Sequence, residues 1–493
     1  MRPILRNTLI VLLVLAVLIG GFVFYVLRGN PSDRPLSDTV GLDPVLVEPE
    51  PRWIPSVSLA EPIGWKDGEK PIAAKGLAVS RFAQGLDHPR TMLTLPNGDV
   101  LVAETNSPPR DGGGIEGMVM KLLMGQVGAA GPSPNTLVLL RDADGDGTAE
   151  QRFDFRTADM RSPSGMAYRD GKLYVANHDA VLEFAFEPGA TSLTGKPKKR
   201  MDLPAGGNHW MRNLLLSEDG KQLYVAVGSA TNIADNGMEA EQGRAAIWEI
   251  DTDTGRRRPY AAGMRNPNGL AWNPSTGEMW ATVQERDMLG PDLVPDYLTN
   301  VPVGAQYGWP WVYWKDHFDE RVEWPMETYM LEYTRKPEYA LGAHASALGL
   351  LFAGEGNRLG QSFANGAFIA RHGSWNRKPP VGYDVVFVPF DGNGNPQGKP
   401  VSVLSGFLMK SGDTHGRPTW LAWDKTGALL VSDDTSGVIW RVEAPGAAPS
   451  AAPKPVDTES LKPLEGLQDP TQQRSFEADF SGGADRVLNR DEP

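Results

Sequence analysis

The chain of 493 residues contains no cysteine. This absence excludes disulfide bonds, thiolate metal sites, a cysteine nucleophile and c-type haem attachment. Basic residues are also fewer than acidic ones. The chain has 48 Lys and Arg and 61 Asp and Glu, which gives a formal net charge of −13. An acidic chain without a basic stripe repels phosphate backbones, which argues against nucleic acid as a partner.

Several catalytic signatures are missing as well. The sequence has no serine elbow, no phosphate-binding loop, no HExxH motif and no glycine fingerprint for dinucleotides. Gly and Pro, in contrast, are plentiful, with 55 and 41 residues. They favour many turns over long helices, and we therefore expect an all-β fold.

One long apolar run lies near the N-terminus. Residues 8–27 carry no charge and consist mostly of Leu, Val and Ile. A helix of this length spans about 30 Å, the thickness of a bilayer's hydrocarbon core. Arg2 and Arg6 precede the run, which favours a cytoplasmic N-terminus. We predict an inner-membrane anchor over residues 1–28, with the rest of the chain in the periplasm; a cleaved signal peptide is the alternative.

The segments that flank the central region differ from it in composition. Residues 29–77 are rich in Pro, Asp and Glu, and we expect an extended tether there that adds a strand to the main domain. Residues 443–493 contain APGAAPSAAPKP and are then polar, which predicts a disordered tail. The folded domain is therefore expected over residues 78–442.

This central region contains six similar units. Each has a short apolar strand, a turn with Asp-Gly, Asn-Gly or a near equivalent, and a second strand rich in Val, Leu, Tyr or Trp. The units begin at His88, Ser162, Met211, Asn266, Ala345 and Gly416. Since a hairpin cannot bury both faces alone, six units stacked around an axis predict a six-bladed β-propeller. A β-sandwich with long loops is the alternative.

The stretch RDADGDGTAE is similar to a calcium-binding loop. Carboxylates stand at positions 1, 3 and 5 of an EF-hand-like pattern: Asp142, Asp144 and Asp146. Gly147 permits the sharp turn, and the carbonyl of Thr148 suits position 7. Phe153 stands where the bidentate glutamate is usual. We therefore expect a structural Ca²⁺ site without a part in chemistry; a solvated acidic turn is the alternative.

Polar side chains recur where the first strands of later units begin. His209 lies in the loop GGNHWMRN, and a histidine with an ordinary pKa of about 6.5 can accept a proton at neutral pH. Arg265 and Asn266 begin the fourth unit, and Arg417 has a similar place in the sixth. Taken alone, each also fits an ordinary role as a loop histidine, a turn Asn-Pro or a surface arginine.

A further polar stretch is ARHGSWNRKPP, which contains Arg371, His372, Asn376 and Arg377. Such a density of cationic and hydrogen-bonding groups suits a planar anionic ligand. Because these clusters stand at equivalent places in the blades, we expect them to converge on one end of the propeller axis. An acidic chain that gathers arginines at one mouth is expected to bind an anion there.

Taken together, several segments resemble a known family. HWMRNLLLSEDGKQLYVAVGS, AAGMRNPNGLAW, NVPVGAQYGWPW and GRPTWLAWDKTGALLVSDD are similar to the pyrroloquinoline quinone (PQQ)-dependent glucose/sorbosone dehydrogenases. RHGSWNR and GYDVVFVPF resemble the bacterial sorbosone dehydrogenase-like branch. The resemblance covers residues 78–442 and implies a six-bladed propeller that holds PQQ and Ca²⁺ near its axis.

The resemblance also implies an activity, the oxidation of an aldose or a sorbosone-type sugar. His209 would be the general base that takes the proton of the sugar C1 hydroxyl while a hydride passes to PQQ. Arg265, Asn266 and Arg417 would contact the cofactor. Arg371 or Arg377 would replace a cofactor lysine of the glucose enzymes. A membrane quinone or a cytochrome would accept the electrons.

The chain departs from the family at the calcium end of the site. Soluble glucose dehydrogenases have a Gln-Gly-Pro segment where this chain has VQERDMLGPDLV, so Glu285 and Asp287 would offer carboxylates in place of carbonyls. Thr419 stands where the family has a second arginine. Two other functions stay open: a cofactor-free propeller that binds a glycan or a protein partner, and a calcium-dependent lactonase.

Overall fold

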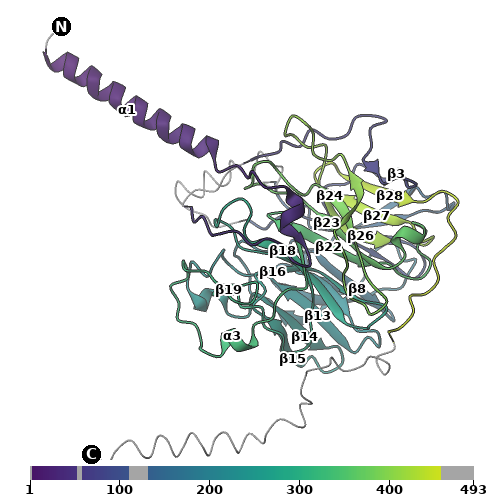
Figure 1. Ribbon diagram of the computed structural model, residues 1–493. Helices are drawn as coiled ribbons and strands as arrows, with labels where there is room; N and C mark the ends of the chain where they lie inside the picture. Colours follow the sequence, from purple (N-terminus) through teal and green to yellow (C-terminus); the bar gives the residue numbers. More distant parts are fainter. Residues whose placement is uncertain (1–2, 53–57, 110–130, 457–493) are drawn as a thin grey trace, which may run out of the picture. The chain divides into compact units, whose positions relative to one another are not determined.

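The computed structural model describes residues 3–52, 58–109 and 131–456. Six antiparallel sheets form the blades of a β-propeller (Figure 1). The first three blades are β4 (Pro89–Thr94), β5 (Val100–Glu104), β6 (Thr136–Arg141) and β7 (Gln151–Phe155); β8 (Gly165–Arg169), β9 (Lys172–Ala176), β10 (Ala180–Ala185) and β11 (Lys198–Asp202); and β12 (Leu214–Leu216), β13 (Gln222–Val227), β14 (Ala246–Asp251) and β15 (Arg257–Ala262).

The other three blades have additional or distant strands. They are β16 (Asn266–Trp272), β17 (Met279–Gln284), β18 (Pro295–Asn300), β21 (Tyr339–Ala343) and β1 (Val40–Gly41); β22 (Ala347–Phe352), β23 (Gly366–Arg371), β24 (Asp384–Pro389), β25 (Val401–Ser405) and β2 (Ile72–Ala73); and β26 (Pro418–Trp423), β27 (Leu429–Asp433), β28 (Val438–Glu443) and β3 (Ala78–Ala83). The predicted all-β, six-bladed propeller is confirmed.

The ring closes through a strand from the start of the folded region. β3 pairs antiparallel with β28, the last strand of the sixth blade, with Val79 opposite Val442. β1 and β2, which come from residues 29–77, add an outer strand to the fourth and fifth blades. The six innermost strands contact one another in the order β4, β8, β12, β16, β22, β26 and back to β4.

Glycine recurs at one place in the innermost strands because neighbouring strands approach closely there. A Cβ atom on Gly165 would lie 2.3 Å from the backbone O of Arg212 in the next blade. On Gly269 it would lie 2.5 Å from the backbone O of Leu348, and on Gly349 it would lie 2.9 Å from Trp420 Cα. The repeated Gly of SPSG, NPNG and ALG is therefore required by the crossing of the blades.

Four of the six innermost strands, β4, β16, β22 and β26, also have a shift in register close to this crossing. In β16 the shift falls between Pro267 and Leu270, and the freed N–H of Gly269 donates to Thr282 Oγ1 at 2.9 Å. Thr282 Oγ1 in turn donates to the backbone O of Leu348 in the fifth blade at 2.7 Å. Ser432 makes the equivalent link from the sixth blade to the first. A hydroxyl thus joins the fourth blade to the fifth and the sixth blade to the first.

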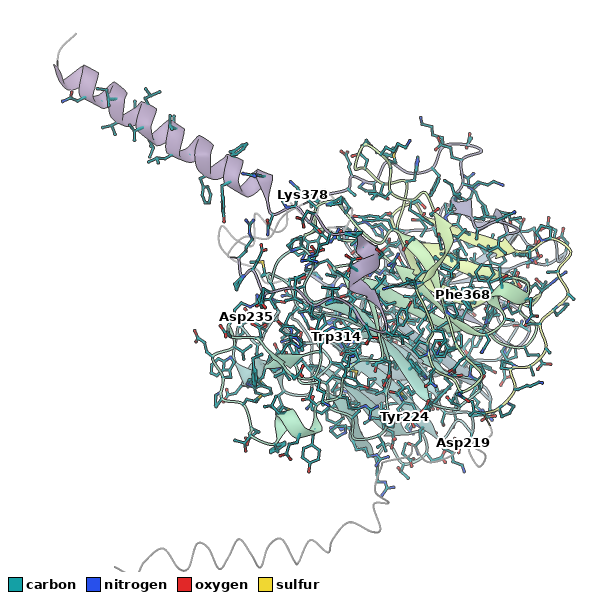
Figure 2. All side chains as sticks on the ribbon, in the orientation of Figure 1. Asp219, Tyr224, Asp235, Trp314, Phe368 and Lys378 are labelled. Atoms are coloured by element: carbon teal, nitrogen blue, oxygen red, sulfur yellow. The ribbon has the colours of Figure 1, made fainter. Side chains whose placement is uncertain are left out.

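Apolar side chains fill the space between adjacent blades. Leu101 and Leu137 of the first blade pack with Val175 and Phe184 of the second in one buried cluster. Figure 2 labels Tyr224 and Phe368, which belong to two other such clusters. Burial of both sheet faces explains the apolar alternation of the six hairpins.

Short elements and one longer helix complete the chain. They are α1 (Pro3–Arg28), η1 (Leu36–Thr39), η2 (Met238–Glu241), α3 (Met330–Tyr333), η3 (Gln361–Phe363) and the hairpin of β19 (Val312–Tyr313) and β20 (His317–Phe318). Within the part of the chain that the structure describes, no helix has both the length and the apolar character needed to cross a membrane. Of the predicted tail, residues 457–493 lie outside the described residues.

Candidate functional site

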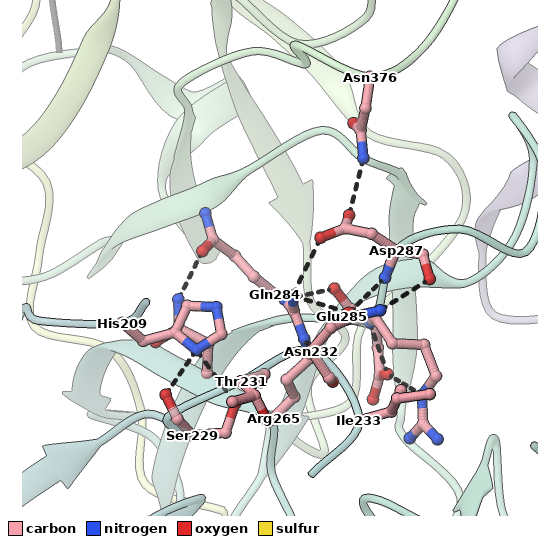
Figure 3. Close-up of polar contacts among 12 residues, drawn as sticks. His209, Ser229, Thr231, Asn232, Ile233, Arg265, Gln284, Glu285, Asp287 and Asn376 are labelled. Carbon is pink, nitrogen blue, oxygen red and sulfur yellow. Dashed lines mark hydrogen bonds and ion pairs between the residues drawn. The ribbon is translucent and has the colours of Figure 1, made fainter. Parts of the chain in front are cut away.

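His209 lies in the loop before β12, where it faces the end of β13. Its Nδ1 atom is 2.8 Å from the backbone O of Ser229 and 3.0 Å from Ser229 Oγ (Figure 3). A carbonyl only accepts, so Nδ1 carries the proton and donates it. Nε2 therefore bears the lone pair, and no hydrogen-bond partner for Nε2 is found among the described residues.

The surroundings of His209 favour the neutral imidazole. Burial and the positive charge of Arg265 lower the pKa of His209 well below its usual value. The Ser229 carbonyl and the Asp287 carboxylate oppose this shift without reversing it. His209 is thus unprotonated at neutral pH and can accept a proton at Nε2.

A buried arginine holds the loop that carries His209. Arg212 Nη1 donates to the backbone O of His209 at 2.8 Å, and Nη2 donates to the backbone O of Pro204 at 2.9 Å. Arg212 has no exposed surface, and this burial lowers its pKa to about 9. The loop is therefore fixed by a cation that pairs with carbonyl groups.

Asn266 connects His209 to the fourth and fifth blades. A Cβ on Gly228 would lie 2.3 Å from Asn266 Oδ1 and 2.6 Å from His209 Cβ, so glycine allows both side chains to approach. Asn266 Nδ2 donates to Gln284 Oε1 at 2.6 Å, and Gln284 Nε2 donates to Ser346 Oγ. A hydrogen-bonded row thus joins the fourth and fifth blades, and His209 packs close to its first member, Asn266.

Asp287 is the centre of a second, charged group. Its carboxylate accepts from Arg265 Nη2 at 3.0 Å and from Asn376 Nδ2 at 2.8 Å (Figure 3). Arg265 also donates to the backbone O of Glu285 at 2.7 Å and to Asn232 Oδ1 at 3.0 Å. The predicted neighbours Arg265, Asn266 and Asp287 are therefore brought together with His209.

His344 is a member of this group that the sequence interpretation missed. Its Nε2 lies 2.9 Å from the backbone O of Gly290 and its Nδ1 lies 3.3 Å from Asp287 Oδ1, so both nitrogens face acceptors. Burial would lower the pKa of His344, but the hydrogen bond and charge of Asp287 raise it. Its place just before β22, at the start of the fifth unit, was the signal that could have found it.

Arg265 and His344 in turn lower the pKa of the Asp287 carboxyl. Burial alone would raise the pKa of its carboxyl, but the charge of Arg265 and the contacts with His344 and Asn376 hold that pKa well below the usual range. Asp287 is therefore a carboxylate whose charge and lone pairs are matched by protein groups.

Arg417 presents a different arrangement on the sixth blade. It is 4% exposed, its Nη2 donates to Tyr383 Oη at 3.2 Å, and its Cζ lies 5.1 Å from the centre of the Tyr383 ring. Arg417 Nε is buried and has no hydrogen-bond partner in the described part of the chain. A buried guanidinium donor without a partner is costly, and Arg212 Nε beside the His209 loop is also without a partner among the described residues.

Arg90 of the first blade shares this property. Arg90 Nη1 donates to Asp434, which also pairs with His372 Nε2 at 3.0 Å, while Arg90 Nε is buried without a partner among the described residues. The side chain of Arg90 lies over the ring of Trp210, with Cζ 5.6 Å from its centre. Arg90 was not singled out from the sequence, although it stands at the first strand of its unit like Arg417.

The structure does not bring the other predicted residues to this group. Arg371 makes a two-pronged ion pair with Asp384, and Arg377 donates to Asp292 and to two backbone carbonyls. The buried Glu285 carboxylate accepts from Arg286 Nε at 2.9 Å. These three side chains support the blades, and their donors or acceptors are already used.

The acidic loop between β6 and β7 is a separate site. Four carboxylates can place oxygen atoms within 4.8 Å of one another: Asp142, Asp144, Asp146 and Glu150. Glu150 is a member that the sequence interpretation missed, although it stands at position 9 of the calcium-loop pattern. The N–H of Thr148 donates to Asp146 Oδ1 at 2.8 Å, which helps to fold the loop around these oxygens.

Comparison with known proteins gives the family. The model of the TrAA12-like family matches residues 136–296 and 323–445. These two ranges are more than half of the chain, and the chain therefore belongs to the TrAA12-like family.

Two curated relatives share parts of the sequence. An uncharacterized protein of Borreliella burgdorferi is 26% identical over 298 residues, which are 57% of this chain and 76% of that protein. A pyrroloquinoline quinone-dependent pyranose dehydrogenase of Coprinopsis cinerea is 32% identical over 125 residues. That match covers 22% of this chain and only 16% of the fungal enzyme.

Solved structures share the fold. The Trichoderma reesei protein of Carbohydrate-Active Enzymes Family AA12 superposes with a TM-score of 0.61 at 20% identity, over 76% of this chain and 97% of that chain. The holo form of the PQQ domain of the Coprinopsis cinerea pyranose dehydrogenase has a TM-score of 0.58 at 20% identity, over 78% and 100%. At this identity the likeness establishes the propeller fold.

Proposed function

We propose that the chain oxidises a sugar with PQQ as its cofactor. The observation that carries the proposal is a neutral His209 with a bare Nε2, next to the arginine-rich group of the later blades. Relatives that are named as PQQ-dependent sugar dehydrogenases support the class of reaction. We extend the proposal to an aldose or a sorbosone-type sugar as the substrate.

The unpaired donors of the site fit this cofactor. PQQ is a planar quinone with three carboxylates, and buried N–H groups of Arg417 and Arg90 without protein partners suit such an anion. Arg265 adds positive charge, although Asn232, Asp287 and the Glu285 carbonyl already take most of its donors. Arg417, Arg90 and Asn266 are the residues that we assign to holding the cofactor.

A calcium ion at Glu285 and Asp287 does not fit equally well. The Glu285 carboxylate is paired with Arg286, and the Asp287 carboxylate is paired with Arg265 and His344. A cation there would compete with two arginines and a histidine for the same oxygens. The Glu285 and Asp287 carboxylates are therefore assigned to ion pairs within the protein.

The residues of the chain supply the proton chemistry and the orientation. A bound quinone would supply the centre that accepts two electrons. His209 Nε2 takes the proton from the sugar hydroxyl, while Nδ1–H stays on the Ser229 carbonyl and fixes the ring. The carboxylate of Asp287 stabilises the imidazolium that forms, because its charge favours protonated His209.

The loop of residues 142–150 has a structural part in this proposal. Its four carboxylates concentrate negative charge at the turn between β6 and β7. Lys425 Nζ lies 3.6 Å from Asp142 Oδ2 and neutralises only a part of it. We assign a Ca²⁺ ion to this loop, where it would join the two outer strands of the first blade.

We further propose that the chain is anchored at the periplasmic face of the inner membrane. The uncharged run of residues 8–27 supports this location. So does the exposure of apolar side chains on α1, such as Leu13 at 65% and Val17 at 66%. An anchor would hold the enzyme next to a membrane quinone or a cytochrome as electron acceptor.

Substitution His209→Gln tests the base. We expect dye reduction with aldoses to fall by about 100-fold or more, because the proton acceptor is lost, while PQQ still quenches tryptophan fluorescence. The wild-type kcat/KM should fall only on the acid side, below pH 6.5, because the lowered pKa keeps His209 neutral above it. His317→Gln, at an exposed histidine, is the control. An active His209→Gln enzyme would remove this residue from the base role.

Two arginine variants separate cofactor binding from support of the fold. Arg417→Met should weaken PQQ binding by about tenfold or more in fluorescence titration, because it removes an unpaired donor. Arg371→Met should keep the PQQ affinity and lower the free energy of unfolding by about 3 kcal/mol, because Asp384 loses its partner. Weaker PQQ binding by Arg371→Met, with unchanged PQQ binding by Arg417→Met, would contradict the assignment of Arg417 to the cofactor.

Thermal unfolding tests the calcium loop. Ca²⁺ at about 100 times its dissociation constant should stabilise the protein by about 2.7 kcal/mol, and Mg²⁺ should not match it. Asp144→Asn with Asp146→Asn should abolish the shift in Tm, whereas Asp170→Asn at an exposed turn should leave it unchanged. An equal shift in the double variant would mean that calcium binds elsewhere.

Membrane fractionation tests the anchor. The full chain should remain in carbonate-washed membranes, and protease added to spheroplasts should digest the propeller. Leu13→Asp with Val17→Asp should release the chain, because each charge opposes insertion by about 3 kcal/mol. Full-length wild-type chain in the soluble fraction would contradict the anchored location.

A further inference from the structure

The segment between β18 and β21 carries a surface that the proposed reaction does not use. Among the described residues beyond α1, every exposed Phe, Trp and Tyr side chain lies in this segment: Phe318, Trp324, Tyr329 and Tyr333. Tyr329 and Tyr333 are 54% and 67% exposed and meet edge to face. Aromatic side chains grouped in this way are typical of interaction sites.

The same segment is strongly acidic. Exposed carboxylates alternate with the aromatic side chains: Asp316, Glu320, Glu323, Glu327 and Glu332. Within residues 316–333, Arg321 is the one Lys or Arg, and it is paired with the buried Asp319. These aromatic and acidic side chains together form the 316–333 surface, which has an excess of negative charge.

The 316–333 surface is joined directly to the candidate site. Arg321 Nη1 donates to the backbone O of Asp287 at 2.9 Å, and Asp287 pairs with Arg265. Trp324 Nε1 donates to the backbone O of Ala234 at 2.9 Å. Both acceptors lie in loops that contact Arg265. Asp287 pairs with Arg265 directly, and Asn232, in the loop that contains Ala234, accepts a hydrogen bond from it (Figure 3).

Buried ion pairs fix the shape of this segment. Arg321 donates with two nitrogens to Asp319, at 2.8 Å and 2.7 Å. Arg286, which has no exposed surface, donates to the backbone O of Pro310 and of Val312. The exposed side chains thus stand on a frame that is already formed, which lowers the cost of binding a partner.

We infer that the 316–333 surface docks a basic one-electron carrier protein, an inference that rests on the proposed sugar oxidation. The five exposed carboxylates outnumber the exposed basic residues next to the surface, Lys315 and Lys336, and so favour a positively charged partner. Aromatic side chains provide the anchors of a protein interface. A neutral saccharide would donate hydrogen bonds to the carboxylates, but its binding would not depend on their net charge. A small neutral acceptor would need no docking surface.

The electron balance agrees with such a partner. Oxidation of a CH–OH group to C=O releases two electrons and two protons. Each oxidised carrier takes one electron, so two carriers are reduced in turn for each sugar and the protons go to solvent. Docking at the 316–333 surface would bring each carrier to the Asp287 side of the candidate site.

A binding experiment without cofactor tests the surface. The full chain, free of PQQ, is titrated with an oxidised c-type cytochrome of positive net charge, and with an acidic one, by calorimetry. We expect binding of the basic cytochrome alone, weakened about tenfold between about 20 mM and 150 mM salt. Glu323→Lys with Glu327→Lys should weaken it by about tenfold at low salt. Tyr329→Ser with Tyr333→Ser should weaken it as well.

The matched control reverses exposed carboxylates elsewhere, Glu218→Lys with Glu355→Lys, and should leave the affinity within about twofold. Equal losses in both charge variants, equal binding of the acidic cytochrome, or no binding at low salt would each overturn the inference. With PQQ added, the Glu323/Glu327 variant should reduce a neutral dye normally and the cytochrome slowly. Specific cytochrome binding without any sugar oxidation would support the surface and reject the proposed function instead.

Discussion

The close approach of the innermost strands at the propeller axis is the constraint on which the site depends. Gly165, Gly269 and Gly349 leave no room for a side chain where one blade crosses the next. Thr282 and Ser432 then use their hydroxyls to join neighbouring blades just beyond the register shift. Because these strands are held at the crossing, the backbone of the residues just before the crossing is held in position as well. Polar side chains that are far apart in the sequence therefore lie close together with little conformational freedom.

The charges of the site follow from this packing. One side is closed, since Asp287 is matched by Arg265, His344 and Asn376. On the other side, Arg417 Nε and Arg90 Nε are buried donors that have no hydrogen-bond partner among the described residues. His209 stays neutral because burial and Arg265 disfavour its charged form. The arrangement combines unpaired arginine donors with a neutral histidine, and the proposed oxidation of a sugar by a tricarboxylated quinone would use both.

The fold could be predicted from the sequence because its signals are local. Each hairpin shows its apolar alternation and its turn within about 20 residues, and six such hairpins have few ways to bury both faces. The place of His209 could be predicted for the same reason. Its protonation state could not, because Ser229 and Arg265 lie 20 and 56 positions further along the chain.

The roles of the arginines depend still more on distant partners. Arg371 and Arg417 look alike in the sequence. Asp384 accepts a hydrogen bond from Arg371 Nε, whereas no group in the described chain accepts one from Arg417 Nε. Arg377 finds its partners around residue 291, which no spacing rule indicates. His344 and Glu150 are different, because each stood in a pattern already recognised and could have been included.

A crystal structure of the chain grown with PQQ tests the central claim most directly. We expect quinone carboxylates on the free donors of Arg417 and Arg90, His209 Nε2 facing the quinone ring, and Asp287 still paired with Arg265 and His344. A quinone bound away from these arginines, or a calcium ion that draws Asp287 from Arg265, would contradict it.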